Sequence, residues 1–155
     1  MTDYTAIIST PVGHLGIITD NQHLLKIDFL SPSSRLFLPQ DSLTQKVIKQ
    51  LNEYFLRPSN YIFNLPIHLT GTTLQVNVWS KLKKIPPGKT LTYSELANQV
   101  KTHPRVIGNI CRANPIPIVI PCHRVIAKQS LGGFCGKTSG HWPQIKQWLL
   151  DKEKS

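Results

Sequence analysis

The sequence predicts a protein of the α+β or α/β class, with a β-rich lobe over residues 1–70 and a helical lobe over residues 71–155. Three observations favour this division. Short runs of strand-forming residues, separated by turn residues, dominate the first part of the chain. Apolar residues recur at helical spacing after Gly71. Two of the helices expected there are joined by a short turn, which is the outline of a helix-turn-helix.

Three short segments in the first lobe are expected to form a meander of strands. They read "YTAIIS", "LGIITD" and "LLKIDFL", and the turn-rich stretches "TPVGH" and "DNQH" separate them. Strands joined by such short turns are antiparallel neighbours in a sheet. The first lobe is therefore expected to be a sheet of three strands followed by a helix.

The helix of the first lobe is expected to begin at Asp41 or Ser42, because either side chain can cap it, and to end before Arg57-Pro58. Its apolar residues share one face: Leu43, Val47, Leu51, Tyr54 and Phe55. The segment "YIFNLPIHL" alternates apolar and other residues and predicts a half-buried strand. No catalytic cluster is evident in this half, so a structural role is expected for it.

Three helices are expected in the second lobe. The first covers Gln75–Ile85 and is stopped by Pro86-Pro87-Gly88. The second, in "TYSELANQV", begins at a capping box formed by Thr92 and Glu95. The third runs through "RVIGNICRAN", with one face turned inward and two arginines free to face outward: Ile107, Ile110 and Cys111 against Arg105 and Arg112.

The charge of the chain favours a polyanionic partner. Lys and Arg number 18 against 8 Asp and Glu, which gives a net charge of +10 and a pI near 9.8. Nucleic acid is the first expectation and an anionic membrane surface the second. A helical hairpin with surface arginines is also common in proteins that bind no DNA, so the helix-turn-helix outline leaves both readings open.

Composition restricts the compartment and the redox chemistry. The chain has no apolar run near the roughly 18 residues that a membrane helix needs, and no secretory leader. We therefore expect a cytoplasmic protein. Its three cysteines, Cys111, Cys122 and Cys135, show no close Cys-x-x-Cys spacing, so a disulfide framework is not expected and at least one thiol is free.

The stretch "NPIPIVIPCHRVIA" is the strongest candidate for chemistry. Its prolines exclude an ordinary helix and stiffen the chain before Cys122, which suits a positioned nucleophile. A buried cysteine that acts only as a small apolar residue is the alternative. His123 is adjacent to Cys122, and on an extended segment the two side chains would point to opposite sides, so a bend or a bridging water is needed.

A zinc site is a further alternative for the same region. It would draw on Cys122, His123, Cys135 and His141. An adjacent Cys-His pair followed by long gaps fits no standard zinc-ligand spacing. No metal is therefore expected.

The motif residues resemble the O6-alkylguanine-DNA alkyltransferase family, the methylated-DNA–protein-cysteine methyltransferases. The resemblance rests on "LTYSELA", the helix led by Arg105, "NPIPIVIPCHRVIA", "GGFCG" and "IKQWLLDKE", and it covers Leu74 to Glu153. The first lobe resembles the family's N-terminal lobe, an RNase H-like sheet, in its order of elements. The resemblance implies direct repair of DNA, in which the O6-alkyl group of guanine, and also the O4-alkyl group of thymine, moves irreversibly to Cys122.

The family's catalytic groups map onto matched positions of this chain. Cys122 would be the nucleophile, activated by His123 through a water, with Glu153 behind His123. Asn114 would brace the turn that bears the cysteine. Tyr93 would lie against the flipped base and its phosphate, where an acid can quench charge on the leaving guanine.

The resemblance also implies how the substrate is held. The backbone carbonyls of Cys122 and Val125 would read the exocyclic amine, and the amide of Cys135 would face O6. Phe134 stands where tyrosine is frequent in the family, and the link "KTSGHWPQ" is longer than usual. Arg105 would fill the space left by the flipped base in the minor groove, and Arg112 would lie near a phosphate.

The product would be a thioether, so each molecule acts once and needs no cofactor. The expected partner is double-stranded DNA that contains O6-alkylguanine, the protein acting as a monomer, nucleoid-associated if bacterial. Two rival functions remain: a non-catalytic binder of alkylated DNA, which would lack the nucleophile that Cys122 supplies, and a plain helix-turn-helix regulator, which would need no Cys-His-Glu set.

Overall fold

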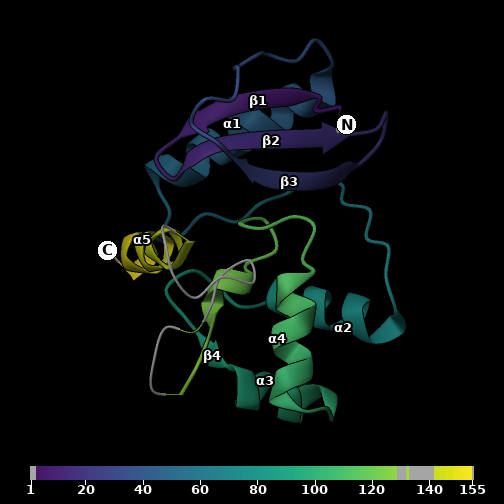
Figure 1. The fold of residues 1–155 in the computed structure, drawn as a ribbon, viewed down its shortest axis with the longest axis vertical. Helices are drawn as coiled ribbons and strands as arrows, with labels where there is room; N and C mark the ends of the chain where they lie inside the picture. Colours follow the sequence, from purple (N-terminus) through teal and green to yellow (C-terminus); the bar gives the residue numbers. More distant parts are fainter. Residues whose placement is uncertain (1–2, 129–131, 133–141, 155) are drawn as a thin grey trace. The chain divides into compact units, whose positions relative to one another are not determined.

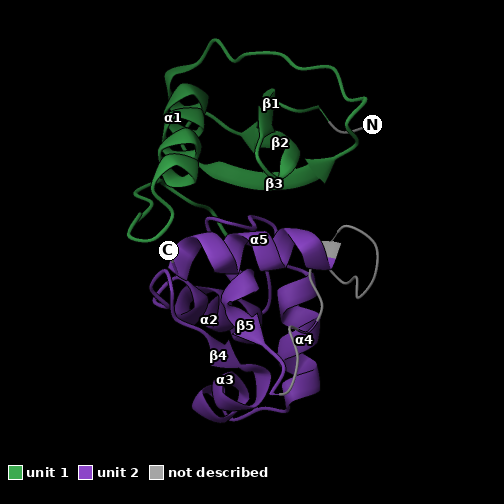
Figure 2. Cartoon of the chain, turned by 90° about the vertical axis from the view of Figure 1, so that its left-hand side faces the viewer, with its two compact units in different colours: residues 1–69 green, residues 70–155 purple. Residues whose placement is uncertain are grey.

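The computed structural model describes residues 3–128, 132 and 142–154 of the 155-residue chain. The chain divides into two compact units, Met1–Leu69 (unit 1) and Thr70–Ser155 (unit 2), which Figure 2 shows in green and purple. Unit 1 contains a small sheet and one helix (Figure 1). Unit 2 is mainly helical.

The sheet of unit 1 has three antiparallel strands in the order β1-β2-β3. They are β1 (Ala6–Thr10), β2 (Gly13–Thr19) and β3 (Leu24–Leu30), which confirms the meander that the sequence predicts. Gly13, with φ +110°, makes the tight turn between β1 and β2, a backbone conformation that side chains disfavour. The apolar residues that alternate along the strands form the core of the unit together with residues of the following helix: Leu15, Ile17, Leu24, Ile27, Val47, Leu51 and Tyr54.

The helix of unit 1, α1 (Ser42–Leu56), begins where the sequence predicts. Asp41 is its N-cap, and its carboxylate accepts the backbone N–H of Thr44 at 2.8 Å. The helix ends at Leu56, one residue before the Arg57-Pro58 pair, because a residue that precedes proline is disfavoured in the helical region.

The strand predicted over "YIFNLPIHL" is wrong. The segment does alternate between half-buried and exposed residues, as the pattern indicated. It makes only an isolated parallel bridge, between Leu24 and Ile67, with hydrogen bonds from Leu24 N to Pro66 O and from His68 N to Leu24 O. Pro66 has no N–H to extend a ladder of hydrogen bonds, so this segment alternates in burial but does not form a strand.

Unit 2 opens with α2 (Thr73–Leu82) rather than with a helix over Gln75–Ile85. A capping box between Thr72 and Gln75 starts the helix earlier than the apolar spacing indicated. The chain then tightens into turns, in which Ile85 N donates to Leu82 O, before the Pro-Pro-Gly stop. The apolar face is buried as predicted, and the Trp79 indole donates to Ile110 O at 3.1 Å.

The helix-turn-helix that the sequence predicts is present as α3 (Tyr93–Val100) and α4 (Pro104–Arg112). Thr92 caps α3 through the predicted capping box with Glu95. The turn passes through Lys101, whose left-handed backbone (φ 59°) ends α3. The His103 ring then accepts the N–H of Arg105 and caps α4. Ile107, Ile110 and Cys111 face inward, while Arg105 and Arg112 are exposed, as expected.

In the rest of unit 2, segments that lie far apart in the sequence pack together. A short two-stranded parallel sheet pairs β4 (Leu91–Thr92) with β5 (Val125–Ile126), and a 3₁₀ turn, η1 (Cys122–Arg124), directly precedes β5. The C-terminal helix α5 (Trp142–Lys154) packs against η1. Because β4 leads straight into α3, this pairing sets the start of the helix-turn-helix beside the cysteine segment.

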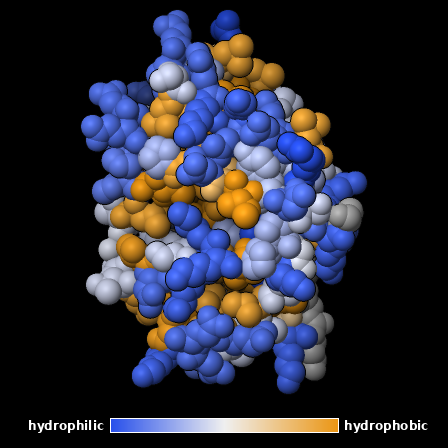
Figure 3. Space-filling view, turned by 180° about the vertical axis from the view of Figure 1, so that it is seen from behind, coloured by the Kyte–Doolittle hydropathy of each residue, from blue (hydrophilic) through white to orange (hydrophobic). Residues whose placement is uncertain are grey.

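Hydrophilic residues cover most of the face shown in Figure 3, with apolar residues between them. In the part of the chain that the structure describes, no helix is long and apolar enough to span a membrane.

Candidate active site in unit 2

A sequence of tight turns holds Cys122 in place. Within the proline-rich approach, Ile120 N donates to Ile116 O and Cys122 N donates to Ile120 O, both at 2.8 Å. Ile118 in the middle of this segment is buried and has φ +75°, a costly conformation for a β-branched residue that only a well-packed surrounding sustains. Cys122 itself is 5% exposed.

Asn114 ties this segment together. Its side-chain amide donates to Ile120 O at 2.8 Å, and its carbonyl oxygen accepts Ile116 N–H at 2.9 Å. Burial raises the pKa of the Cys122 thiol, and a hydrogen bond from Asn114 and the charge of Lys146 both oppose that rise. The structure thus places Asn114 next to the cysteine, as the sequence indicated.

The 3₁₀ turn at Cys122–Arg124 supplies the bend that an extended segment would lack. His123 is fully buried, and its Nε2 lies 2.7 Å from Glu153 Oε2 at the far end of the chain. Burial lowers the pKa of His123, with Glu153 opposing, so the ring is neutral at pH 7. The other ring nitrogen, Nδ1, makes no hydrogen bond to any described residue.

Arg124 completes the buried cluster, although nothing in the sequence pattern singles it out beyond its place in the motif. Its Nε and Nη2 donate to the two oxygens of Glu153 at 2.9 and 3.0 Å, and Nη1 donates to Ile85 O. Burial alone would raise the pKa of Glu153, but the hydrogen bonds from His123 and Arg124 outweigh it and lower the pKa to about 2. Glu153 is therefore a carboxylate at neutral pH.

Lys146 is the site residue that the sequence analysis missed. Its side chain is fully buried, its Nζ donates to Val125 O at 2.7 Å, and it lies 5.7 Å from the centre of the Tyr93 ring. A signal was available: Lys146 precedes Glu153 by seven residues, so the two share one face of α5. A lysine on the buried face of a helix is rare enough to indicate a specific partner.

Tyr93, the first residue of α3, stands beside the cysteine segment. Burial raises its pKa to about 12, and the Cys111 and Cys122 thiols add to that rise. A Cβ on Gly132 would lie 3.0 Å from the Tyr93 ring, so the chain passes close to the tyrosine there. Tyr93 therefore keeps its proton at neutral pH.

Two predicted pocket residues, Phe134 and Cys135, lie outside the described residues, as does His141 of the alternative zinc set. Among the residues that the structure describes, no group of three or more His, Cys, Asp or Glu side chains could hold a metal ion. Arg105 and Arg112 lie on the exposed side of α4 and take no part in the buried cluster.

The two units and the site define a class of protein: a helix-turn-helix unit that carries a buried cysteine beside a His–Glu–Arg cluster, preceded by a small sheet unit. Comparison with known families agrees. Residues 4–69 match the family described as 6-O-methylguanine DNA methyltransferase, ribonuclease-like domain, and residues 73–155 match its DNA binding domain.

Individual relatives match almost end to end. A protein of Acanthamoeba polyphaga mimivirus is 36% identical over 152 residues, covering 96% of this chain and 95% of its own. The methylated-DNA–protein-cysteine methyltransferase of Saccharolobus solfataricus is 33% identical over 151 residues, covering 95% and 93%.

Solved structures of O6-methylguanine methyltransferases have a similar fold. The O6-methylguanine methyltransferase of Mycobacterium tuberculosis superposes with a TM-score of 0.79 at 30% identity, over 96% of this chain and 90% of that one. A structure of the Mycobacterium tuberculosis protein in complex with DNA has a TM-score of 0.77 at 31% identity, over 96% and 91%. The chain belongs to the 6-O-methylguanine DNA methyltransferase family. The predicted ribonuclease-like first lobe and helix-turn-helix second lobe are thereby confirmed.

Proposed function

We propose that this protein repairs DNA by direct reversal, moving the O6-alkyl group of guanine, and the O4-alkyl group of thymine, to the sulfur of Cys122. Membership of the family supports the reaction class. The observation that carries the choice of residue is the surrounding of Cys122: a buried thiol braced by Asn114, with the charge of Lys146 acting to lower its pKa.

Activation of Cys122 requires a base, because burial raises the pKa of the thiol and only the thiolate attacks. His123 supplies it in our proposal. With Nε2–H donated to Glu153, the lone pair of Nδ1 is free to take the thiol proton through a bridging water. The charged Glu153 then stabilises the imidazolium that forms.

The proposed alkyl transfer requires no cofactor. The Cys122 thiolate forms a bond to the alkyl carbon as the bond from that carbon to O6 breaks, and the guanine takes up a proton. Tyr93 donates that proton in our proposal, and its pKa of about 12 keeps it protonated until then. The thioether has no acyl carbon for water to attack, so each molecule turns over once.

Substrate recognition in the proposal combines backbone groups of Cys122 and Val125 with residues Phe134 and Cys135, which lie outside the described part of the chain. The carbonyls of Cys122 and Val125 read the exocyclic amine, the amide of Cys135 faces O6, and Phe134 borders the pocket. Val125 O also accepts the Lys146 ammonium. A carbonyl has two lone pairs, so both partners are compatible.

DNA binding is assigned to the exposed side of α4, entering the minor groove. Arg105, at the start of that helix, fills the gap left by the flipped nucleotide, and Arg112 contacts a phosphate. A Cβ on Gly108 of α4 would meet nothing within 4 Å, so this face is open for a close approach. Because Cys122 is only 5% exposed, the alkyl group reaches it as part of an extruded base.

We further propose that the sheet lobe and the alkyl-acceptor lobe, residues 1–70 and 71–155, act together as a monomer in the cytoplasm, on the nucleoid if the source is bacterial. The presence of Cys122 weighs against a non-catalytic binder of alkylated DNA. The buried cluster of His123, Glu153 and Arg124 weighs against a plain regulator, which has no use for it.

The test is the mass of the protein after incubation with an excess of duplex DNA containing O6-methylguanine. We expect one added methyl group per chain, located on the Cys122 peptide, and none in a Cys122→Ala variant. Cys111→Ala is the matched control, since it removes another buried thiol and is expected to accept the methyl normally. An unmodified protein beside repaired DNA would refute the proposal.

A further inference from the structure

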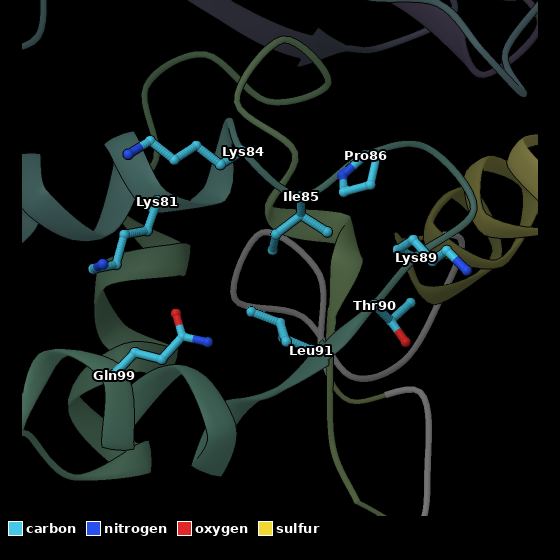
Figure 4. A pocket seen from close by; sticks show the side chains of 8 residues that line it. All are labelled: Lys81, Lys84, Ile85, Pro86, Lys89, Thr90, Leu91 and Gln99. Carbon is cyan, nitrogen blue, oxygen red and sulfur yellow. The ribbon is translucent and has the colours of Figure 1, made fainter.

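A second concave site opens on unit 2, beside the buried cluster: the backbone oxygen of Ile85, which lines it, accepts Arg124, and Leu91, which also lines it, pairs with Val125. It is a pocket of about 280 Å³ formed by the end of α2, the segment that leads into β4, and α3 (Figure 4). Ile85, Pro86 and Leu91 give it apolar walls, and Lys81, Lys84 and Lys89 surround them. None of these residues belongs to the proposed alkyl-transfer machinery.

The side chains divide the pocket into a centre and a rim. Ile85 and Leu91 face the centre, and the ammonium groups of Lys84 and Lys89 lie toward opposite sides (Figure 4). Ile85 is 7% exposed and Leu91 is half-buried, whereas Lys84 and Lys89 are exposed. An apolar floor between separated cations fits a ligand with an apolar group in the middle and negative charges around it.

The positive charge of the rim is not neutralised within the described chain. The pocket is lined by no carboxylate, and none of its three lysines forms a salt bridge to a described residue. The nearest acid on α3 in sequence, Glu95, is engaged by the Thr92 N–H in the capping box. Lys83, an exposed residue next to Lys84 in the chain, adds a further positive charge to this segment.

We propose that this pocket docks an acidic peptide segment of a partner protein. One apolar side chain inserts between Ile85 and Leu91, and flanking Asp or Glu carboxylates pair with Lys84 and Lys89, with Lys81 as a third contact. Lysines on flexible stems suit such pairing because each adjusts to its own carboxylate. A central apolar anchor with a charged rim is the usual anatomy of a small protein interface.

A nucleic-acid backbone fits the same lysines less well. Most contacts to a nucleic-acid backbone are made to phosphate and sugar oxygens, which pair with lysines but leave the apolar floor of Ile85 and Leu91 poorly covered. Figure 2 also shows α4, the proposed DNA-binding helix, at one side of unit 2 and α2 and β4 at the other. We therefore expect duplex bound on the exposed face of α4 to leave the pocket open, so that the peptide and damaged DNA bind at the same time.

The direct test is fluorescence anisotropy with a labelled nine-residue peptide, four Asp on each side of a central Phe. We expect binding to the full-length protein that weakens about tenfold when Ser replaces the Phe, because the apolar anchor is lost at unchanged charge. A peptide with Lys in place of every Asp is expected not to bind.

Two double variants with the same net charge separate the pocket from general attraction. Lys84→Glu/Lys89→Glu is expected to weaken the Phe peptide about tenfold or more. Lys46→Glu/Lys49→Glu, which reverses two exposed lysines on α1, is expected to change it by less than about twofold. Thermal unfolding of both variants checks the fold.

Three outcomes overturn the proposal: equal affinity for the Phe and Ser peptides, equal losses in the two double variants, or displacement of the peptide by undamaged duplex or single-stranded DNA. The last outcome assigns the lysines to nucleic acid instead. Methyl transfer to Cys122 is measured in parallel and is expected to be unchanged in Lys84→Glu/Lys89→Glu, so failure of the docking site and failure of the repair function are read separately.

Discussion

Lys146 Nζ lies 2.7 Å from the carbonyl oxygen of Val125, in a fully buried position on α5. This contact joins the C-terminal helix to the strand that follows Cys122. It also sets a positive charge close enough to Cys122 to oppose the rise in the pKa of its thiol that burial causes. A buried ammonium is costly unless it is paired, so its retention here indicates a specific task.

Replacing this lysine with methionine tests that task. Lys146→Met keeps the length of the side chain and removes the charge, so the pKa of the Cys122 thiol rises and methyl transfer at pH 7 slows by about tenfold for each unit of the shift. The pH profile of single-turnover transfer measures it directly, since the rate recovers at high pH. Lys152→Met, an exposed lysine on the same helix, is the control. A profile identical to that of the wild type would contradict the assignment.

Stability in acid should depend on Glu153. Its pKa of about 2 in the folded protein lies below the ordinary 4.5, so the fold favours the carboxylate. The resulting stabilisation, about 3 kcal/mol, is complete above about pH 5 and is lost as the pH falls toward 2. Urea unfolding at pH 7, 4 and 3, followed by tryptophan fluorescence, measures it in unit 2, where all three tryptophans lie.

The matched variants are Glu153→Gln and Asp151→Asn, which alter a buried and an exposed acid of α5. Glu153→Gln leaves Arg124 buried without its carboxylate and is expected to cost about 3–5 kcal/mol at pH 7 and to flatten the acid dependence. Asp151→Asn is expected to leave the dependence intact. If the free energy of unfolding depended on pH in the same way in both variants, Glu153 would not be the source of the acid dependence.

Removal of Asn114 should damage the cysteine turn. Asn114→Ala leaves Ile116 N without its partner and removes one of the two donors to Ile120 O, and it is expected to cost about 1–3 kcal/mol in the free energy of unfolding. Transfer to Cys122 should fall more than stability explains, because the thiol loses its position and a hydrogen bond. Transfer rates measured well below the unfolding midpoint, with the exposed Asn98→Ala as control, separate the two effects.

Arg105→Ala tests base extrusion. If Arg105 fills the space of the flipped nucleotide, repair in duplex DNA falls about tenfold or more, while attack on free O6-benzylguanine, which needs no extrusion, is unchanged. The comparison of the two substrates is the measurement. The exposed Arg35→Ala in unit 1 controls for lost charge. Equal losses on both substrates would exclude Arg105 from this step.

Local patterns predicted most of the fold because their causes are local. The capping box of Thr92 and Glu95, the helical spacing of Ile107, Ile110 and Cys111, and the Asp41 cap all act within a few residues. The strand prediction for residues 61–69 was wrong, because alternating burial does not show whether backbone N–H donors are available to form a ladder. Pro66 has no N–H and interrupts the row of donors.

The helix-turn-helix, the stiff approach to Cys122 and, through the motif, the family and the place of Glu153 behind His123 could all be predicted from the sequence. The buried position of Lys146 and the contacts that join these charges come from the packing of segments that lie far apart in the chain. Lys146 and Glu153 reach the 122–125 segment from α5, more than twenty residues further along the chain, and Arg124 anchors to Ile85 across unit 2. The pKa values of Cys122, His123 and Glu153 shift only once the chain has packed around them, and spacing along a sequence does not encode that environment.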